Sequence, residues 1–110
     1  MVERSEKQLD LIFHALSDST RRHILRALGE NGELTVSEMA EPFRMSLAAV
    51  SKHIKVLEGA GLLRRTVDGR IHRCRMDAAP LEQASELIAH YRKFWEGQFD
   101  LIEQYLKERL

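Results

Sequence analysis

Apolar residues recur every three or four positions near both ends of the chain. The first series predicts an amphipathic helix over about residues 6–16, and the last predicts a long helix over about residues 80–108. A helix of that length cannot bury its whole apolar stripe against so small a body, so a second subunit is its natural cover. The residues expected between two subunits are Leu9, Ile12 and Phe13 on the first helix and Leu81, Ile88, Tyr91, Trp95, Phe99 and Ile102 on the last.

A second helix is expected directly after the first. Ser17, Asp18 or Ser19 can accept hydrogen bonds from its free backbone N–H groups. Its first turn carries Arg21 and Arg22, whose positive charges oppose the helix dipole. The sequence leaves open whether these two arginines serve packing or contact with a phosphate.

Two further helices are predicted from their capping residues. Thr35, with Glu38 three positions later, forms a capping-box pattern in which each side chain satisfies a free backbone donor. This helix is short, because Pro42 has no N–H for the next helical hydrogen bond. Ser46 then caps a helix over about residues 47–59, which ends at the glycines that follow.

A β-hairpin is predicted over about residues 62–76, because two extended segments flank Asp68 and Gly69, a pair that suits a type I′ turn. Pairing across a two-residue loop at this position would place Leu63 opposite Cys74. One face of the hairpin would then be apolar and the other basic. The apolar face would carry Leu63, Cys74 and Met76, and the basic face would carry Arg64, Arg73 and Arg75.

Together these elements predict one domain over residues 1–110 that is mainly α with a small β-hairpin. A short helix, a tight turn and a longer capped helix form a helix-turn-helix over about residues 35–60. The hairpin over about residues 62–76 would be its wing. The predicted fold class is a winged helix-turn-helix that dimerises through helices over about residues 6–16 and 80–108.

The formal net charge of the chain is zero, but the charge is unevenly distributed. The segment from Arg44 to Arg75 carries a net charge of +6, so the remaining residues carry −6. A basic segment within an acidic chain suits a localised contact with a polyanion and limits nonspecific association. For a helix-turn-helix, the expected polyanion is double-stranded DNA.

The helix over residues 47–59 should have one apolar face and one small, basic face. Small residues let a helix approach a DNA groove, serine can bond a base edge or a phosphate, and lysine can read guanine. This helix is therefore the expected DNA-reading element. Its buried face would carry Val50, Ile54 and Leu57, and its outward face Ala48, Ser51, Lys52 and Lys55.

Three stretches of the chain resemble the ArsR/SmtB family of bacterial repressors. They are residues 16–25 (LSDSTRRHIL), residues 34–40 (LTVSEMA) and residues 45–62 (MSLAAVSKHIKVLEGAGL). The resemblance covers roughly residues 9–76 and, through the long last helix, extends to the whole chain. Its pattern is specific, because the cap, the serine-lysine-histidine run and the glycine spacing coincide.

The resemblance implies a homodimer that binds a pseudo-palindromic operator and represses transcription by blocking polymerase access. Two DNA-reading helices would enter successive major grooves about 34–36 Å apart. A small-molecule inducer that releases the DNA is compatible with this family, although the sequence identifies none. The matching positions nominate Leu47, Ala48, Ser51 and Lys52 for base or groove contacts, and Ser46, Lys55, Arg64, Arg65, Arg70 and Arg73 for phosphate or wing contacts.

The chain departs from the metal-sensing members of this family. Thr35 and Ser37 stand where those members have a pair of cysteines, and neither can replace a thiolate ligand. The last helix offers only His90, with Glu86 one turn before it, where other members pair Asp and His residues. We therefore expect no metal site and no cofactor, and we expect Cys74 to be an inert packing residue.

An enzyme is not expected, because the sequence has no glycine-rich phosphate loop and no cysteine-histidine-acid constellation. No membrane segment is evident, and a cytoplasmic, nucleoid-associated protein is expected. Two alternatives stay open. The chain could be a winged-helix module for protein interaction or DNA architecture, or a regulator that senses an apolar ligand near Tyr91, Phe94 and Trp95.

Overall fold

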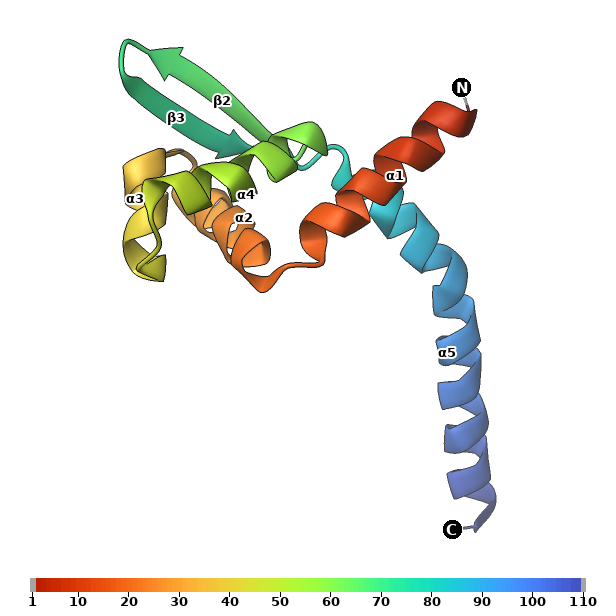
Figure 1. Cartoon of the computed structure of the whole chain (residues 1–110). Helices are drawn as coiled ribbons and strands as arrows, with labels where there is room; N and C mark the ends of the chain where they lie inside the picture. The colour runs from red at the N-terminus through yellow and green to blue at the C-terminus, as the bar shows by residue number, and fades with distance from the viewer. Residues whose placement is uncertain (1, 110) are drawn as a thin grey trace.

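The computed structural model describes the backbone of residues 2–109 and the side chains of residues 6–109. As predicted, the fold is mainly α with a small antiparallel sheet (Figure 1). The strand order of the sheet is β1-β3-β2. The elements are α1 (Val2–Leu16), α2 (Ser19–Asn31), β1 (Leu34–Thr35), α3 (Val36–Ala40), the 3₁₀ turn η1 (Glu41–Phe43), α4 (Leu47–Gly59), β2 (Leu63–Asp68), β3 (Ile71–Met76) and α5 (Leu81–Arg109).

The core lies where α1, α2, α3 and α4 meet the inner face of the sheet. The largest fully buried side chains come from every one of these elements, so each helix is held by its own apolar stripe. Burying a large aliphatic side chain contributes roughly 1.5–3 kcal/mol. These side chains are Ile12, Ile24, Leu28, Met39, Val50, Ile54, Leu57, Leu62 and Cys74.

The two arginines at the start of α2 form hydrogen bonds across the corner between α1 and α2. Arg21 donates from Nε to the carbonyl of Ala15 (2.8 Å), and Arg22 donates from Nη1 to the carbonyl of Leu16 (2.7 Å). Both guanidinium groups thus satisfy carbonyls that the end of α1 leaves without helical donors. Asp18 is the N-cap, since its carboxylate accepts from the N–H of Arg21 at 3.1 Å.

The predicted caps of α3 and α4 are present. Both hydrogen bonds of the capping box form between Thr35 and Glu38, at 3.0 and 3.2 Å, and the hydroxyl of Ser46 accepts from the N–H of Ala49 at 3.1 Å. The α3 helix gives way to η1, which contains the proline. Arg44 then takes a left-handed conformation with φ 52°, which is uncommon for a residue other than glycine and turns the chain sharply into α4.

The register of the hairpin differs from the prediction. Leu63 pairs with Met76 rather than with Cys74, and the loop consists of Gly69 and Arg70. Only Gly69 has a positive φ in this loop (62°), which fits a type II′ turn with glycine in its first position. Because the register shifts by two residues, every side chain keeps its predicted face.

A short third strand was not predicted. Leu34 and Thr35 form β1 and pair with Cys74 and Arg73 of β3. A strand of two residues has no period of its own, so only the pairing with a distant segment defines it. The strand holds the base of the wing against the start of α3.

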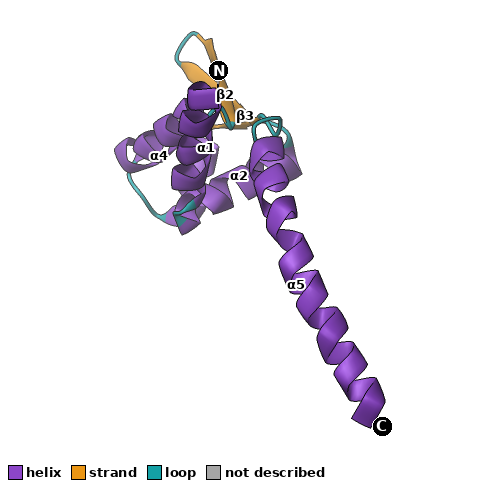
Figure 2. Ribbon diagram, turned by 90° about the vertical axis from the view of Figure 1, so that its right-hand side faces the viewer, coloured by secondary structure: helices purple, strands orange, loops and turns teal. Residues whose placement is uncertain are grey.

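The α5 helix leaves the body after its first turn (Figures 1 and 2). Ala84 is buried and Gln83 donates to the side chain of Gln8 on α1 at 2.9 Å, but every residue from Ser85 to Arg109 is exposed. The radius of gyration is 18.8 Å, against about 13 Å for a compact chain of this length. The exposed large apolar side chains of α5 are Leu87, Ile88, Tyr91, Phe94, Trp95, Phe99, Leu101, Ile102, Tyr105 and Leu106.

One residue predicted to lie between subunits is placed elsewhere. Ile12 is 0% exposed within the single chain, because α1 turns this side chain toward the core. It has no surface left for a second subunit, and the prediction for Ile12 was wrong. On the same helix Phe13 is exposed and Leu9 is half-buried, and Leu81 packs half-buried against the core from the start of α5.

Acid is expected to weaken the fold through its capping carboxylates. The hydrogen bond from the backbone N–H of Arg21 lowers the pKa of Asp18, and the N–H of Thr35 lowers the pKa of Glu38. A carboxyl with a lowered folded-state pKa stabilises the fold above its unfolded pKa of about 4, and that contribution is lost as the pH falls through the folded value. We expect the free energy of unfolding, measured in urea at fixed chain concentration, to fall from about pH 5 downward.

Asp18→Asn isolates the contribution of one cap. Asparagine caps a helix about as well as aspartate but does not titrate, so this variant should fold and show a shallower loss of stability in acid. Asp100→Asn, a change of an exposed acid on α5, is the matched control and should keep the wild-type slope. A slope for Asp18→Asn equal to that of the wild type would contradict the role given to this carboxylate.

Candidate nucleic-acid interface

The α4 helix presents a small and basic surface because its other side is anchored in the core. Val50, Ile54 and Leu57 are 0% exposed, which fixes the rotation of the helix about its axis. The predicted outward residues Ala48, Lys52 and Lys55 are exposed and Ser51 is half-buried. Leu47, in the first turn, is 55% exposed, so an aliphatic side chain stands free at the end of the helix.

A groove of about 400 Å³ runs between the N-terminal half of α4 and the wing. Of the predicted DNA-binding residues, it brings together Leu47, Ser51, Arg65 and Arg70. Sequence reasoning missed its other lining residues as parts of a site. Those residues are Thr35, Val36, Ser37, Ile71 and His72.

Hydroxyl groups, arginines and an imidazole line this groove together. Among the residues that the structure describes, no carboxylate lines it, so the groove suits an anion such as a DNA phosphate. Ile71 was missed because the observed pairing places it at the end of its strand, beside the turn. The hydroxyls of Thr35 and Ser37 join the groove only through the way α3 packs on α4, which no local pattern reveals.

Arg65 holds the wing against α4. It lies on the inner face of the hairpin opposite Cys74, and its side chain is 17% exposed. Its Nη2 donates to Oε1 of Glu58 at 2.5 Å, and its Nη1 lies 3.2 Å from Nδ1 of His72. The guanidinium of Arg65, which the resemblance nominated for a phosphate or wing contact, is therefore largely engaged within the chain.

Arg64 and Arg73 lie on the opposite face of the hairpin from the groove. Arg64 donates from Nε to Asp77 at 2.8 Å, and this hydrogen bond lowers the pKa of that carboxyl. Arg73 lies 3.9 Å from Glu33. The structure does not bring these two arginines together with Ser51 and Arg70.

The tip of the wing carries exposed apolar residues beside its arginine. Val67 is 59% exposed and Ile71 is 46% exposed, and both flank the loop of Gly69 and Arg70. An apolar side chain at the tip of a basic hairpin can pack against sugars or base edges while the arginine contacts phosphate. This combination extends the candidate interface beyond the predicted residues.

The far side of α4 is tied to the α1–α2 corner. Nδ1 of His53 lies 3.3 Å from Nη1 of Arg21 and 3.9 Å from Oδ2 of Asp18. The same Arg21 also donates to the carbonyl of His14 at 3.0 Å. The position of α4 therefore depends on side-chain contacts with the corner as well as on the core.

The part of the chain that the structure describes contains no group of three His, Cys, Asp or Glu side chains arranged to hold a metal ion. Within the same residues, no helix is both long and apolar enough to cross a membrane. Cys74 is buried, and this burial raises the pKa of its thiol.

A helix-turn-helix followed by a basic hairpin defines a winged-helix DNA-binding fold. A sequence profile described as a helix-turn-helix domain matches residues 16–66. The uncharacterized HTH-type transcriptional regulator YuzN of Bacillus subtilis (strain 168) is 39% identical over 79 residues, which cover 66% of this chain and 86% of the relative.

Solved structures agree with this assignment. The crystal structure of an ArsR family transcriptional regulator superposes with a TM-score of 0.76 at 38% identity, covering 83% of this chain and 93% of that one. The homodimeric winged helix-turn-helix DNA-binding domain of a possible ArsR-family regulator from Mycobacterium bovis gives a TM-score of 0.62 at 25% identity, with 77% and 81% coverage. This chain belongs to the ArsR family of winged helix-turn-helix transcriptional regulators.

The contact between Arg65 and Glu58 is expected to stabilise the wing. Arg65→Met keeps most of the aliphatic stem but leaves Glu58 without its partner, so we expect the free energy of unfolding to fall by about 1–3 kcal/mol. Amide hydrogen exchange in β2 and β3 should accelerate at the same time. Arg75→Met, an exposed arginine on the other face, should change stability by less than about 0.5 kcal/mol, and an equal loss in both variants would refute the special role of Arg65.

Proposed function

We propose that the chain is a sequence-specific transcriptional regulator, a repressor that binds a pseudo-palindromic operator as a homodimer in the cytoplasm, at the nucleoid. The observation that carries this proposal is the groove between α4 and the wing, which joins hydroxyls and arginines beside an exposed, small-residue helix face. Its activity is binding rather than catalysis. Repression follows when the bound protein blocks access of the polymerase to the promoter.

The proposed contacts follow from which side chains are free to reach DNA. On α4, Leu47, Ala48, Ser51 and Lys52 would enter the major groove, because they form its accessible face. Arg70, with the apolar tip of the wing, would reach the flanking backbone or minor groove. Four other nominated residues would contribute less to DNA binding. Ser46 caps α4, Arg65 is engaged within the chain, and Arg64 and Arg73 lie on the outer face of the wing.

The proposed homodimer rests on the apolar face of α5. Ten large apolar side chains of this helix are exposed, more than a soluble monomer leaves in one contiguous stripe. Phe13 of α1 is exposed as well. A second copy packed on these faces would bury them and would place two α4 helices on one side of the assembly, as a palindromic operator requires.

Operator selection tests the DNA-binding proposal. Duplexes selected from random DNA should share a pseudo-palindromic sequence, and affinity for it should fall as the salt concentration rises. Lys52→Ala should weaken specific binding by about 5- to 150-fold and relax the selected sequence. Arg70→Ala should weaken binding to all sequences and reduce the salt slope by about one.

Arg75→Ala is the matched control, because it removes an equal charge from the face of the wing that points away from the groove. Its operator affinity should stay within about twofold of the wild type. If no sequence is preferred over random DNA at physiological salt, the chain is an architectural or protein-interaction module instead. If Arg75→Ala and Arg70→Ala weaken binding equally, the assigned DNA-facing side of the wing is wrong.

The dimer is tested by placing a charge in the apolar stripe. Trp95→Glu should raise the dimer dissociation constant in analytical ultracentrifugation by at least about tenfold, because a carboxylate would have to be buried without a partner. Lys93→Glu, an exposed change on the opposite side of the same helix, should leave the dimer intact. A wild-type chain that is monomeric at micromolar concentration would contradict the proposal.

A further inference from the structure

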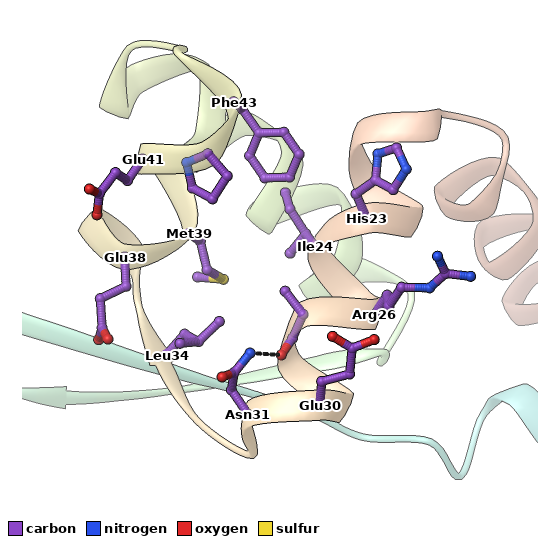
Figure 3. A pocket seen from close by; sticks show the side chains of 12 residues that line it. His23, Ile24, Arg26, Glu30, Asn31, Leu34, Glu38, Met39, Glu41 and Phe43 are labelled. Atoms are coloured by element: carbon purple, nitrogen blue, oxygen red, sulfur yellow. Dashed lines mark hydrogen bonds between the residues drawn. The ribbon is translucent and has the colours of Figure 1, made fainter.

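A second cavity lies between α2 and the α3–η1 segment (Figure 3). It is separate from the DNA groove but shares α3 with it, since Thr35, Val36 and Ser37 line the groove while Leu34, Glu38 and Met39 line the cavity. Its volume is about 490 Å³, within the range of about 300–1,000 Å³ that is typical of small-molecule sites. The proposed function gives this cavity no role. Its floor is apolar and consists of Ile24, Ala27, Leu34, Met39 and Phe43.

The rim of the cavity is acidic. Glu30 comes from α2, while Glu38 and Glu41 come from the opposite side, and Arg26 is the one arginine or lysine among the lining residues. With His23 neutral, the lining carries a net charge of −2. Among the described residues, Glu30 and Glu41 form no ion pair within 4.0 Å, so their charges remain available to a ligand.

The two ends of the cavity differ in character. Figure 3 shows the rings of Phe43 and His23 at one end, where they stack with centroids 6.4 Å apart, and Glu30 with Asn31 at the other. An aromatic face attracts both apolar groups and cations. Asn31 is already turned toward its own helix, since it donates to the carbonyl of Ala27 at 2.7 Å.

We propose that this cavity binds a small lipophilic organic cation, an apolar body that carries an ammonium group, and that its occupancy shifts α4. The apolar body fits the floor and the aromatic end, while the ammonium group is attracted by the acidic rim. An anionic ligand of the same shape is disfavoured by the same carboxylates.

The place of the cavity links its occupancy to DNA binding. One wall is α2, and the other is the α3–η1 segment, which packs on α4 and joins it through Arg44, the residue held at positive φ. A ligand that separates the two walls moves α3 and η1, and the start of α4 moves with them. This second part of the inference rests on the proposed function, because it is measured through the operator.

A series of three compounds of matched shape tests the ligand class without DNA. The ¹⁵N-labelled full chain is titrated with 4-phenylbutylammonium, 4-phenylbutanol and 4-phenylbutyrate at neutral pH. We expect chemical-shift changes centred on α2, α3 and η1, and an affinity for the cation at least about threefold above that for the alcohol, with the carboxylate weakest. Equal affinities for the three, or shifts centred on the aromatic residues of α5, would overturn the assignment.

Charge variants of the rim should change the affinity for the cation in opposite directions. Glu30→Gln and Glu41→Gln should each weaken binding of the cation by about two- to fivefold, whereas Arg26→Gln should strengthen it by a similar factor. Glu6→Gln, the same change at an exposed position of α1, is the matched control and should have no effect. Ala27→Phe should fill the floor and abolish binding, and if that variant unfolds, the opposite effects at Glu30 and Arg26 still decide the outcome.

The effector role is tested with the selected operator. Saturating 4-phenylbutylammonium should weaken operator binding by at least about fivefold in the wild type, but not in a folded variant that no longer binds the compound. Unchanged operator affinity at saturation overturns the effector role. A chain that binds the amine but prefers no duplex would refute the proposed function and leave the ligand site intact.

Discussion

Short helices leave many backbone polar groups without helical partners, and this constraint governs how the DNA-binding unit is built. Three of its helices have 13 residues or fewer, so their ends make up much of their length. Asp18, Thr35 with Glu38, and Ser46 satisfy the free N–H groups at their starts, while Arg21 and Arg22 satisfy carbonyls at the end of α1. The positions of α2, α3 and α4 are therefore set as much by these polar contacts as by the core.

Arg21, at the corner between α1 and α2, also connects several parts of the fold. Arg21 contacts the end of α1, and the same guanidinium lies beside His53 on α4. On its other edge, α4 meets Arg65 of the wing through Glu58. Two separate polar contacts thus tie α4 to the α1–α2 corner on one side and to the wing on the other.

Signals confined to a few neighbouring residues were read correctly from the sequence. The capping box at Thr35 and the cap at Ser46 depend on spacings of three residues, and the buried stripe of α4 depends on the helical period. The faces of the hairpin were also correct, because alternation along a strand survives a register shift of two.

Features that depend on distant segments could not be read in this way. The register itself was missed because Gly69 can occupy either position of a two-residue turn, and β1 exists only through its pairing with β3. Ile12 was misplaced for a related reason. Periodicity shows that a residue faces a partner, but it does not show whether the partner is the core, another subunit or DNA.

The narrow attachment of α5 has a mechanical consequence. The helix is about 43 Å long, yet among the described residues it is held to its own body by its first turn, at Leu81, Gln83 and Ala84. A tilt of about 5° at that attachment moves the far end by about 4 Å, a sizeable part of one turn of helix. Modest substitutions around Gln8 and Gln83 would therefore make small changes to the angle of α5, and so to the geometry of any assembly built through that helix. Related proteins could in this way adapt to differently spaced binding sites without changing the exposed face of α4.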